Sequence, residues 1–285
     1  MGAALDKPIT DKTTERGEST SSAGLQYGAS AMQGWRVDME DEHTCVEDFP
    51  GLPGHAFFAV YDGHGGAKTA ALAHHGMLDA LRKQPAFVKY SNTVKQGGGG
   101  RGREDVALVS EALQAAFIML DAELRPKLAS MCASRNARSS AAISLMAAVL
   151  GVVVGVVFIV VVVVVAMAKA GPPTPDAPKR RLDRHDHLDR RDSSGTTAVA
   201  CLLTPTHLIC ANAGDSRACY CSGGALRDGA VVGGRVIALS EDHKPCSVGE
   251  RARIERAGGR VAQGAMGLGP MRVDGALAVR SVSCE

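Results

Sequence analysis

The stretch FFAVYDGHGG, residues 57–66, ends an apolar run in Asp62, Gly63 and His64. The apolar residues predict a buried strand, and the glycines predict a tight turn directly after it. Such a junction places a carboxylate, an imidazole and approachable backbone carbonyl groups at one rim of a sheet. These groups suit a hard metal ion with acid–base help nearby. An ordinary strand-to-turn junction with a surface aspartate explains this stretch equally well, so other residues must decide.

A second charged stretch, YGASAMQGWRVDMEDEH at residues 27–43, carries Arg36 and then Asp38, Glu40 and Asp41. On a strand, Asp38 and Glu40 would share one face and Asp41 would lie on the other. The planar guanidinium of Arg36 suits a phosphate oxyanion. Alone, the stretch is typical of a solvated strand face. Combined with the aspartate and histidine of the first stretch, it supplies the groups needed for metal-assisted phosphoryl transfer.

Composition excludes some functions. The 285 residues carry 32 basic and 30 acidic side chains, a net charge of +2, which does not indicate a nucleic-acid partner. The eight cysteines form no C-x-x-C pair and predict reduced thiols in a cytoplasmic or nuclear protein. The N-terminus has no apolar secretory segment. Gly2 could be lipidated, although Asp6 stands where the myristoylation pattern prefers serine or threonine.

The elements that must position the charged residues alternate between short strands and amphipathic helices. Apolar spacing predicts helices at residues 67–83, 104–126 and 248–259, and short strands with turn signals return at 195–222. Residues 1–24 are polar, and we expect a flexible leader there. Runs of strands interrupted by helices predict an α+β fold, with antiparallel sheets covered by helices.

One segment does not fit a globular domain. Residues 141–168 are apolar and uncharged, and a proline-rich, charged linker follows at 169–192. As a helix, the apolar segment would be about 42 Å long at ~1.5 Å per residue, enough for a hydrocarbon core of ~30 Å. This pattern predicts a transmembrane segment, which would attach the protein to a membrane.

The ordered motifs resemble those of the PP2C (PPM) family of metal-dependent serine/threonine protein phosphatases. The resemblance covers residues 1–95 and 193–279 well and 104–130 loosely, and the leader MGAALDKP is similar to that of alpha/beta-type members. It implies an α/β/β/α sandwich of antiparallel sheets flanked by helices, with phosphoproteins as substrates. The motifs that carry it are the two stretches above and then SGTTAVACLL, ANAGDSRA, LSEDHKP, RIERAGGRV and RVDGALAV.

The resemblance also implies a site for two Mg²⁺ or Mn²⁺ ions and a third metal position. Asp62 would bridge the two ions, and the Gly63 carbonyl would contact one of them. Glu40 and Asp41 would act mainly through metal-bound waters. Asp215, in ANAGDSRA, matches a family acid near the third position.

Two further residues receive catalytic roles from the same resemblance. Arg36 would hold the substrate phosphate, and His64 would protonate the leaving serine or threonine oxygen. The chain also departs from the family. After RVDGALAV it reads RSVSCE, so the later motifs that supply further metal carboxylates are missing, and we expect a C-terminally truncated domain with little turnover.

The apolar segment separates two halves that should share one core, and a genuine membrane span would place them on opposite sides of a bilayer. An unusual insertion, an inaccurate gene model and a fragmentary membrane protein remain as explanations, and we favour the gene model. The predicted division follows from this reading: a leader at 1–24, phosphatase parts at 25–140 and 193–285, and the apolar segment and linker at 141–168 and 169–192.

Three functional hypotheses follow. The first is hydrolysis of phosphoserine and phosphothreonine in proteins, and the second is a pseudophosphatase that binds phosphoproteins without turnover. The third is a single-pass membrane protein whose phosphatase-like parts do not assemble. The first two place the protein in the cytoplasm or nucleus, by the family, whereas the third places it in a membrane.

Overall fold

The computed structural model describes residues 4–21, 24–97, 105–131, 194–227, 230–263, 271–273 and 283–284. The chain divides into two compact units: residues 1–125 together with 193–285, and residues 126–192. The elements that carry the predicted site all belong to the first unit. The apolar segment 141–168 and the linker 169–192 lie outside the described residues, as do residues 274–282 and Glu285.

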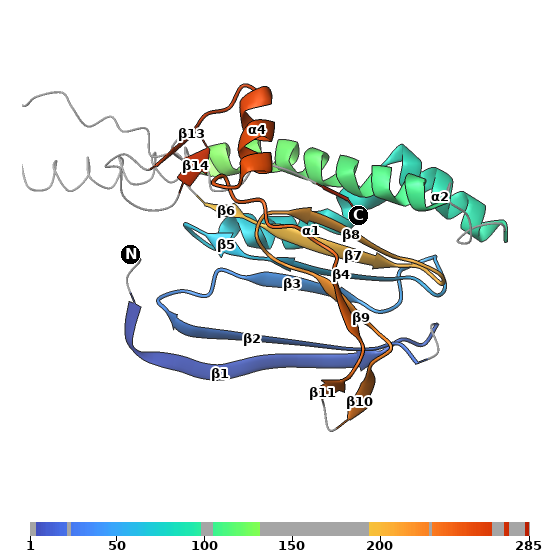
Figure 1. Ribbon diagram of the computed structural model, residues 1–285. Coiled ribbons are helices and arrows are strands. Elements are labelled where there is room, and N and C mark those ends of the chain that lie inside the picture. Colours follow the sequence, from blue (N-terminus) through green and yellow to red (C-terminus); the bar gives the residue numbers. More distant parts are fainter. Residues whose placement is uncertain are drawn as a thin grey trace, which may run out of the picture. The chain divides into compact units, whose positions relative to one another are not determined.

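A five-stranded antiparallel sheet forms the centre of the first unit (Figure 1), in the order β15-β8-β7-β4-β3. Strand β4, with the sequence AFFAVY, pairs with β3 on one side and with β7 on the other. Its mostly apolar sequence suits this inner position. The strands are β3 (Glu42–Val46), β4 (Ala56–Tyr61), β7 (Ala198–Leu203), β8 (Leu208–Ala213) and β15 (Ser283–Cys284).

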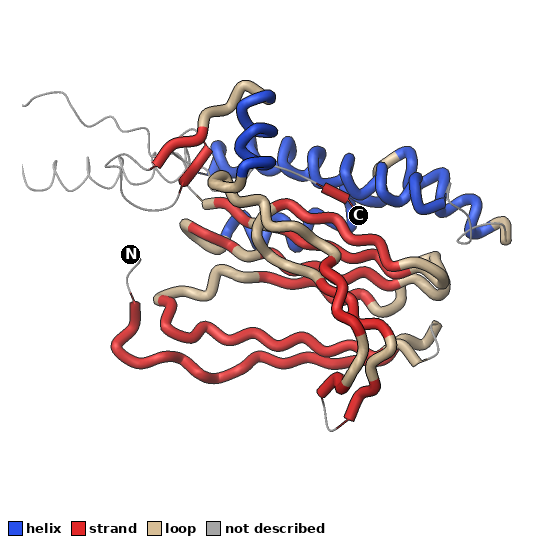
Figure 2. Tube along the Cα trace, in the orientation of Figure 1, coloured by secondary structure: helices blue, strands red, loops and turns tan. Residues whose placement is uncertain are grey.

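Helices cover one face of this sheet (Figure 2), namely α1 (Lys68–Arg82), α2 (Pro85–Lys95) and the helical residues 105–125. In α1, apolar residues at three-and-four spacing make one buried stripe, which includes Ala73 and Met77. Thr44 on β3 makes a 3.0 Å hydrogen bond with His74 on α1. Pro85 begins α2, where its missing N–H costs no helix bond.

A long hairpin lies on the other side of the sheet. Strand β1 (Ala4–Glu18) pairs with β2 (Gln26–Arg36), and the ring of Tyr27 lies 5.5 Å, centroid to centroid, from that of Phe58 on β4. The expected flexible leader at 1–24 is therefore wrong for residues 4–18. Polarity pointed to disorder, but threonines favour strands and β2 supplies a ladder partner in continuous register from Lys12 onward.

Shorter elements complete the described part of the first unit. All of its described strand pairs are antiparallel, so antiparallel sheets combine with helices, as the sequence predicts. Ile254, on helix α4 (Val248–Arg256), packs with Val261 and Val273 in a small core. The remaining elements are β5 (Gly63–His64), β6 (Gly195–Thr196), β9 (Cys219–Ser222), β10 (Ala225–Arg227), β11 (Ala230–Val232), β12 (Arg235–Ala238), α4 (Val248–Arg256), β13 (Val261–Gln263) and β14 (Met271–Val273).

No helix among the described residues combines the length and the apolar character that a membrane crossing requires. The predicted transmembrane segment at 141–168 stays a prediction, because it falls outside them.

Candidate active site

The turn after β4 is held by hydrogen bonds to its backbone. The Asp62 N–H donates to the Thr197 hydroxyl oxygen at 3.3 Å, and the Thr197 N–H donates to the Asp62 carbonyl at 2.9 Å. The Thr196 hydroxyl donates to the same carbonyl at 3.2 Å. These contacts fix the main chain of Asp62, while its side chain remains exposed to solvent. The carboxylate is therefore presented at the end of the strand on a rigid backbone.

Gly63 brings the acidic stretch against this turn. A β-carbon on Gly63 would lie 2.1 Å from the carbonyl oxygen of Glu40, so only glycine allows this approach. Strand β2 ends at Arg36, and the acids that follow it are not in a strand. The expected sharing of a strand face by Asp38 and Glu40 is therefore wrong, because the chain leaves the ladder to reach the turn.

Four of the predicted charged residues act electrostatically on a fifth, Asp62, at this turn. Neighbouring atoms remove part of the water around the Asp62 carboxyl and raise its pKa above the ordinary value, although the residue as a whole is exposed. The negative charges of Asp41 and Asp215 raise this pKa further, whereas Arg36 and His64 act in the opposite direction. The net shift of the pKa is upward, with desolvation as its largest cause, and a cation placed among these acids would offset their mutual repulsion.

His64 lies on β5, directly after the turn, whereas Arg36 is the last residue of β2. In the β5–β6 pair, His64 stands opposite Gly195, and a β-carbon on Gly195 would lie 2.5 Å from Cε1 of the imidazole. The ring therefore lies directly over Gly195. Arg36 is exposed at the end of β2, where the side chain of Gln33 donates to the Arg36 carbonyl at 2.9 Å and to the Val37 carbonyl at 2.8 Å.

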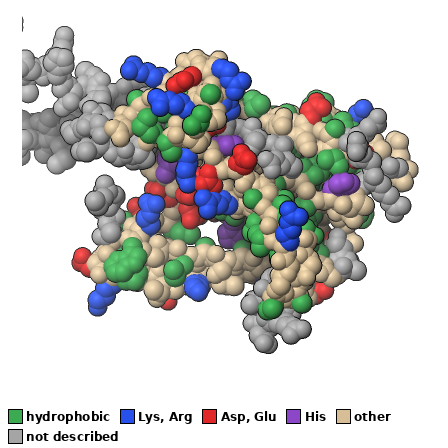
Figure 3. All heavy atoms as spheres, in the orientation of Figure 1, with side chains coloured by type: hydrophobic (Ala, Val, Ile, Leu, Met, Phe, Trp, Pro, Cys, Tyr) green, Lys and Arg blue, Asp and Glu red, His purple; other side chains and the backbone are tan. Residues whose placement is uncertain are grey.

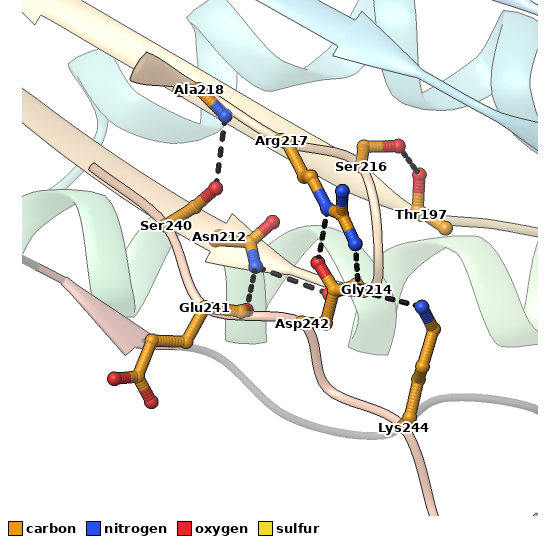
Figure 4. A network of polar contacts seen from close by, with 10 residues as sticks. All are labelled: Thr197, Asn212, Gly214, Ser216, Arg217, Ala218, Ser240, Glu241, Asp242 and Lys244. Carbon is orange, nitrogen blue, oxygen red and sulfur yellow. Dashed lines mark hydrogen bonds and ion pairs between the residues drawn. The ribbon is translucent and has the colours of Figure 1, made fainter. Parts of the chain in front are cut away.

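Polar contacts connect the segment after β8 to the turn and to residues 240–244 (Figure 4). The Thr197 and Ser216 hydroxyl oxygens are 2.6 Å apart, which links the turn to the segment that carries Asp215. The Asn212 side-chain amide donates to the carbonyls of Gly214, at 3.1 Å, and Glu241, at 2.8 Å. A β-carbon on Gly214, which has a φ of +133°, would lie 2.5 Å from Cβ of Thr197.

An ion-pair network joins Arg217, in this segment, to Asp242 and Lys244. Arg217 binds Asp242 through two hydrogen bonds of 2.7 Å, and Lys244 reaches the same carboxylate at 2.6 Å (Figure 4). Hydrogen bonds from the two cations hold the pKa of Asp242 well below its usual range. The pKa values of Arg217 and Lys244 are raised, mainly by Asp242 and in part by Asp215. Acidic and basic side chains gather between the hairpin and α4 on the face shown in Figure 3.

The sequence did not predict this network. The motif LSEDHKP carries Asp242 and Lys244, but Arg217 lies 25 residues earlier, and no helix or strand spacing links residues so far apart. The signal available in the sequence was the presence of Arg217 two residues after Asp215 in ANAGDSRA.

The donor groups fit a hard divalent ion. Carboxylate and carbonyl oxygens are the ligands that Mg²⁺ and Mn²⁺ prefer. In the described part of the chain, no three acids of this cluster bring their ligand oxygens within 4.8 Å of one another. An ion held here would therefore keep several water ligands, as Mg²⁺ commonly does in proteins.

Comparison with known proteins identifies the family. Residues 25–149 and 174–282 match the sequence profile described as "Protein phosphatase 2C". The chain is 31% identical over 280 residues to Protein phosphatase 1B of Mus musculus, and the match covers 98% of this chain and 51% of that protein. It is 30% identical over 280 residues to Protein phosphatase 1A of Homo sapiens, with 98% and 50% covered.

A solved structure shares the fold. The serine-threonine phosphatase 2C of Toxoplasma gondii superposes with a TM-score of 0.51 at 17% identity, over 99% of this chain and 77% of that one. This chain combines antiparallel sheets covered by helices with an acidic turn at the end of one strand. The chain belongs to the protein phosphatase 2C family. It spans about half the length of the curated relatives it matches.

Proposed function

We propose that this chain carries out metal-dependent hydrolysis of phosphoserine and phosphothreonine in proteins. The proposal rests on the family and on one observation, the electrostatic coupling of Asp62 to Asp41, Asp215, Arg36 and His64. We propose with it the α/β/β/α sandwich. A helical layer, the five-stranded sheet and the β1–β2 hairpin follow one another in that order, which supports three of its layers.

The acids are assigned to two Mg²⁺ or Mn²⁺ ions and to a third position. Asp62 would hold both ions, the Gly63 carbonyl would contact one, and Asp215 would serve the third position. Glu40 and Asp41 would act through intervening water. When bound, such ions lower the pKa of a water molecule and offset the negative charge of the phosphate. The hydrogen-bonded backbone of Asp62 suits this role, since the main chain that carries the carboxylate is fixed before any ion binds.

The basic groups are assigned to the substrate. Arg36 would bind the phosphate oxygens through its planar guanidinium. Water attacks phosphorus, the bond from phosphorus to the serine or threonine oxygen breaks, and His64 would donate a proton to that leaving oxygen. The imidazole lies over Gly195, beside the Asp62 turn, and this position supports the role.

The proposal is tested on the full chain, and on the chain lacking residues 139–170, with a phosphothreonine peptide and millimolar Mn²⁺. We expect slow metal-dependent release of phosphate, in line with the little turnover expected from the sequence, and Asp62→Asn should abolish it. Release that is absent from both folded proteins, or that survives in Asp62→Asn, contradicts the proposal.

A second candidate is a pseudophosphatase that binds phosphoproteins without turnover. One observation favours it: no three acids of the described cluster bring ligand oxygens within 4.8 Å of one another. Its prediction is that the folded chain binds the phosphothreonine peptide, loses this affinity in Arg36→Ala, and releases no phosphate at any Mn²⁺ concentration.

Two features bear on where the protein is located, and they support different compartments. Six cysteines whose side chains the structure describes are free thiols, which supports a reducing compartment and hence the cytoplasm or nucleus. We also propose that residues 141–168 insert into a membrane when they are translated, since each central valine contributes roughly −0.3 kcal/mol and no charge opposes insertion. Resistance of the tagged full chain to carbonate extraction tests this; a folded protein wholly in the soluble fraction contradicts it.

A further inference from the structure

Three potential metal ligands converge away from the acidic turn. Glu15 lies on β1, and His43 and Cys45 lie on β3. Their ligand atoms all lie within 4.8 Å of one another, and the Glu15 Oε1 atom is 3.2 Å from Nε2 of His43. Among the residues that the structure describes, they are the group of three that meets this distance.

The fold explains why these side chains meet. Side chains alternate along a strand, so His43 and Cys45 share the face of β3 opposite to Thr44, which contacts α1. That face is turned towards the β1–β2 hairpin, which the Tyr27–Phe58 ring contact joins to the sheet. Glu15 stands opposite Ala29 within the regular part of the hairpin ladder. All three ligands are therefore carried by paired strands rather than by loops.

The distance between two of the ligand atoms is compatible with a tetrahedral ion that has three protein ligands. With metal–ligand bonds of ~2.0–2.2 Å, tetrahedral nitrogen and oxygen ligands stand about 3.3–3.5 Å apart. The distance of 3.2 Å between Glu15 and His43 is close to this value before any ion binds. The side chains of His43 and Glu15 are 31% and 48% exposed, so an ion can enter and a water molecule can complete the coordination.

The ligand types select a different ion from that of the acidic turn. A thiolate and an imidazole favour Zn²⁺ and similar borderline ions, whereas carboxylates and water favour Mg²⁺ and Mn²⁺. We propose that Glu15, His43 and Cys45 form a second, separate metal site for a Zn²⁺-class ion, which joins the β1–β2 hairpin to the central sheet. The inference does not depend on the proposed phosphatase activity.

A simpler interpretation explains the same proximity without an ion. Glu15 makes an ion pair with His43 and accepts a hydrogen bond from the Cys45 thiol. These contacts predict no uptake of metal, and uptake therefore separates the two interpretations.

The experiment uses the full reduced chain, titrated with Co²⁺ in the presence of millimolar Mg²⁺ to occupy sites made of oxygen ligands. We expect one equivalent of Co²⁺ to produce a thiolate-to-cobalt charge-transfer band and the visible bands of tetrahedral Co²⁺, and Zn²⁺ to displace it. Cys45→Ser should remove the charge-transfer band. Glu15→Gln should weaken Co²⁺ affinity by at least about tenfold, the smallest loss typical even of groups that only orient a ligand.

The matched controls are Cys246→Ser, which removes an exposed free thiol elsewhere, and Asp62→Asn, which alters the acidic turn. Both should leave the band unchanged. A folded wild-type protein without the band, or a band that survives Cys45→Ser, overturns the proposal. If Cys45→Ser does not fold, as judged by circular dichroism, the more exposed Glu15 decides: unchanged Co²⁺ affinity in folded Glu15→Gln overturns the proposal equally.

Discussion

The α-carbon of Gly63 lies in direct contact with the backbone of Glu40, and a β-carbon at Gly63 would stand 2.1 Å from the Glu40 carbonyl oxygen. The β3–β4 ladder ends beside this contact with the pair Glu42–Tyr61, so the acidic stretch and the turn leave the sheet next to each other. How closely the acidic stretch then approaches the turn depends on the absence of a side chain at Gly63.

Gly63→Ala should displace the acidic stretch and remove phosphatase activity. The added carbon meets backbone rather than a mobile side chain, so the strain cannot be relieved by a change of rotamer. We expect a loss of about 1–3 kcal/mol in the free energy of unfolding, measured by urea denaturation. Gly249→Ala in α4 is the control, because nothing lies within 4 Å of the added carbon. Equal stability and activity in Gly63→Ala would show that the contact does not position the site.

Asp62→Asn should affect stability in opposite directions without and with metal. Burial and the charges of Asp41 and Asp215 disfavour the ionised Asp62, so the neutral amide should leave the metal-free protein as stable as the wild type or more stable. Mn²⁺ at 100 times its Kd should add about 2.7 kcal/mol to the wild type, and this gain should be lost in the variant. Thermal unfolding with and without Mn²⁺ measures both effects.

The exposed acid Asp11 on β1 provides the control for this comparison. Asp11→Asn should respond to Mn²⁺ as the wild type does. A Mn²⁺ response that is the same in Asp62→Asn would show that Asp62 does not hold the ion.

Local sequence patterns predict some of these elements but not others. The apolar run FFAVY and the glycines after it are sufficient to predict β4 and its turn, and three-and-four spacing predicts α1. The strand β1 escaped prediction because its stability comes from pairing with β2 and from packing on the sheet, not from its own polar sequence.

The site divides in the same way. The motifs carry all seven predicted site residues, but the contacts that place them depend on glycines whose importance lies in tertiary packing. Gly195 under His64 and Gly214 beside Thr197 are examples, because the residues next to them in the chain do not indicate which side chain will pack against them. The proximity of Glu15 on β1 to Cys45 on β3 could not be predicted from the sequence either, because it depends on how the hairpin packs on the sheet.

Asp48→Asn should make the β1–β2 loop less stable at neutral pH. The Asp48 carboxylate accepts hydrogen bonds from the backbone N–H groups of Thr20, at 2.9 Å, and Ser21, at 3.0 Å, and from the hydroxyls of Ser19, Thr20 and Ser21. These bonds, led by that from the Ser21 hydroxyl, hold the pKa of Asp48 well below its usual range. The stabilisation is therefore fully present above the unfolded pKa of ~3.9 and is lost as the pH falls through the folded value.

The measurement is the stability of wild type and Asp48→Asn as a function of pH. The difference should be constant near neutrality and should shrink in strongly acidic solution, as the wild-type carboxylate becomes protonated. Asp6→Asn, at another exposed acid of β1, should show no such trend. A difference that grows on acidification would contradict the assigned hydrogen bonds.

His64→Gln should lower turnover in a way that depends on the leaving group. General-acid help is worth ~10²–10⁴-fold, and a serine or threonine oxygen needs it more than a phenolate does. We expect a loss in this range on a phosphothreonine peptide and a much smaller loss on an aryl phosphate. Equal losses on both substrates would remove His64 from the acid role, since a general disturbance of the site affects both alike.

Gly195→Ala should reproduce this dependence on the leaving group without altering His64 itself. The added carbon would lie 2.5 Å from Cε1 and 2.6 Å from Nε2 of the imidazole, which must therefore move away. Because the clash is with a side chain that can rotate, unfolding stability should change little, in contrast to Gly63→Ala. We expect a smaller loss than in His64→Gln on the phosphothreonine peptide and near-normal turnover of the aryl phosphate. In the double variant, Gly195→Ala should cause no additional loss on the peptide, because the group that it displaces is already absent. An additive loss there would mean that Gly195 supports the site by some contact other than the one with His64.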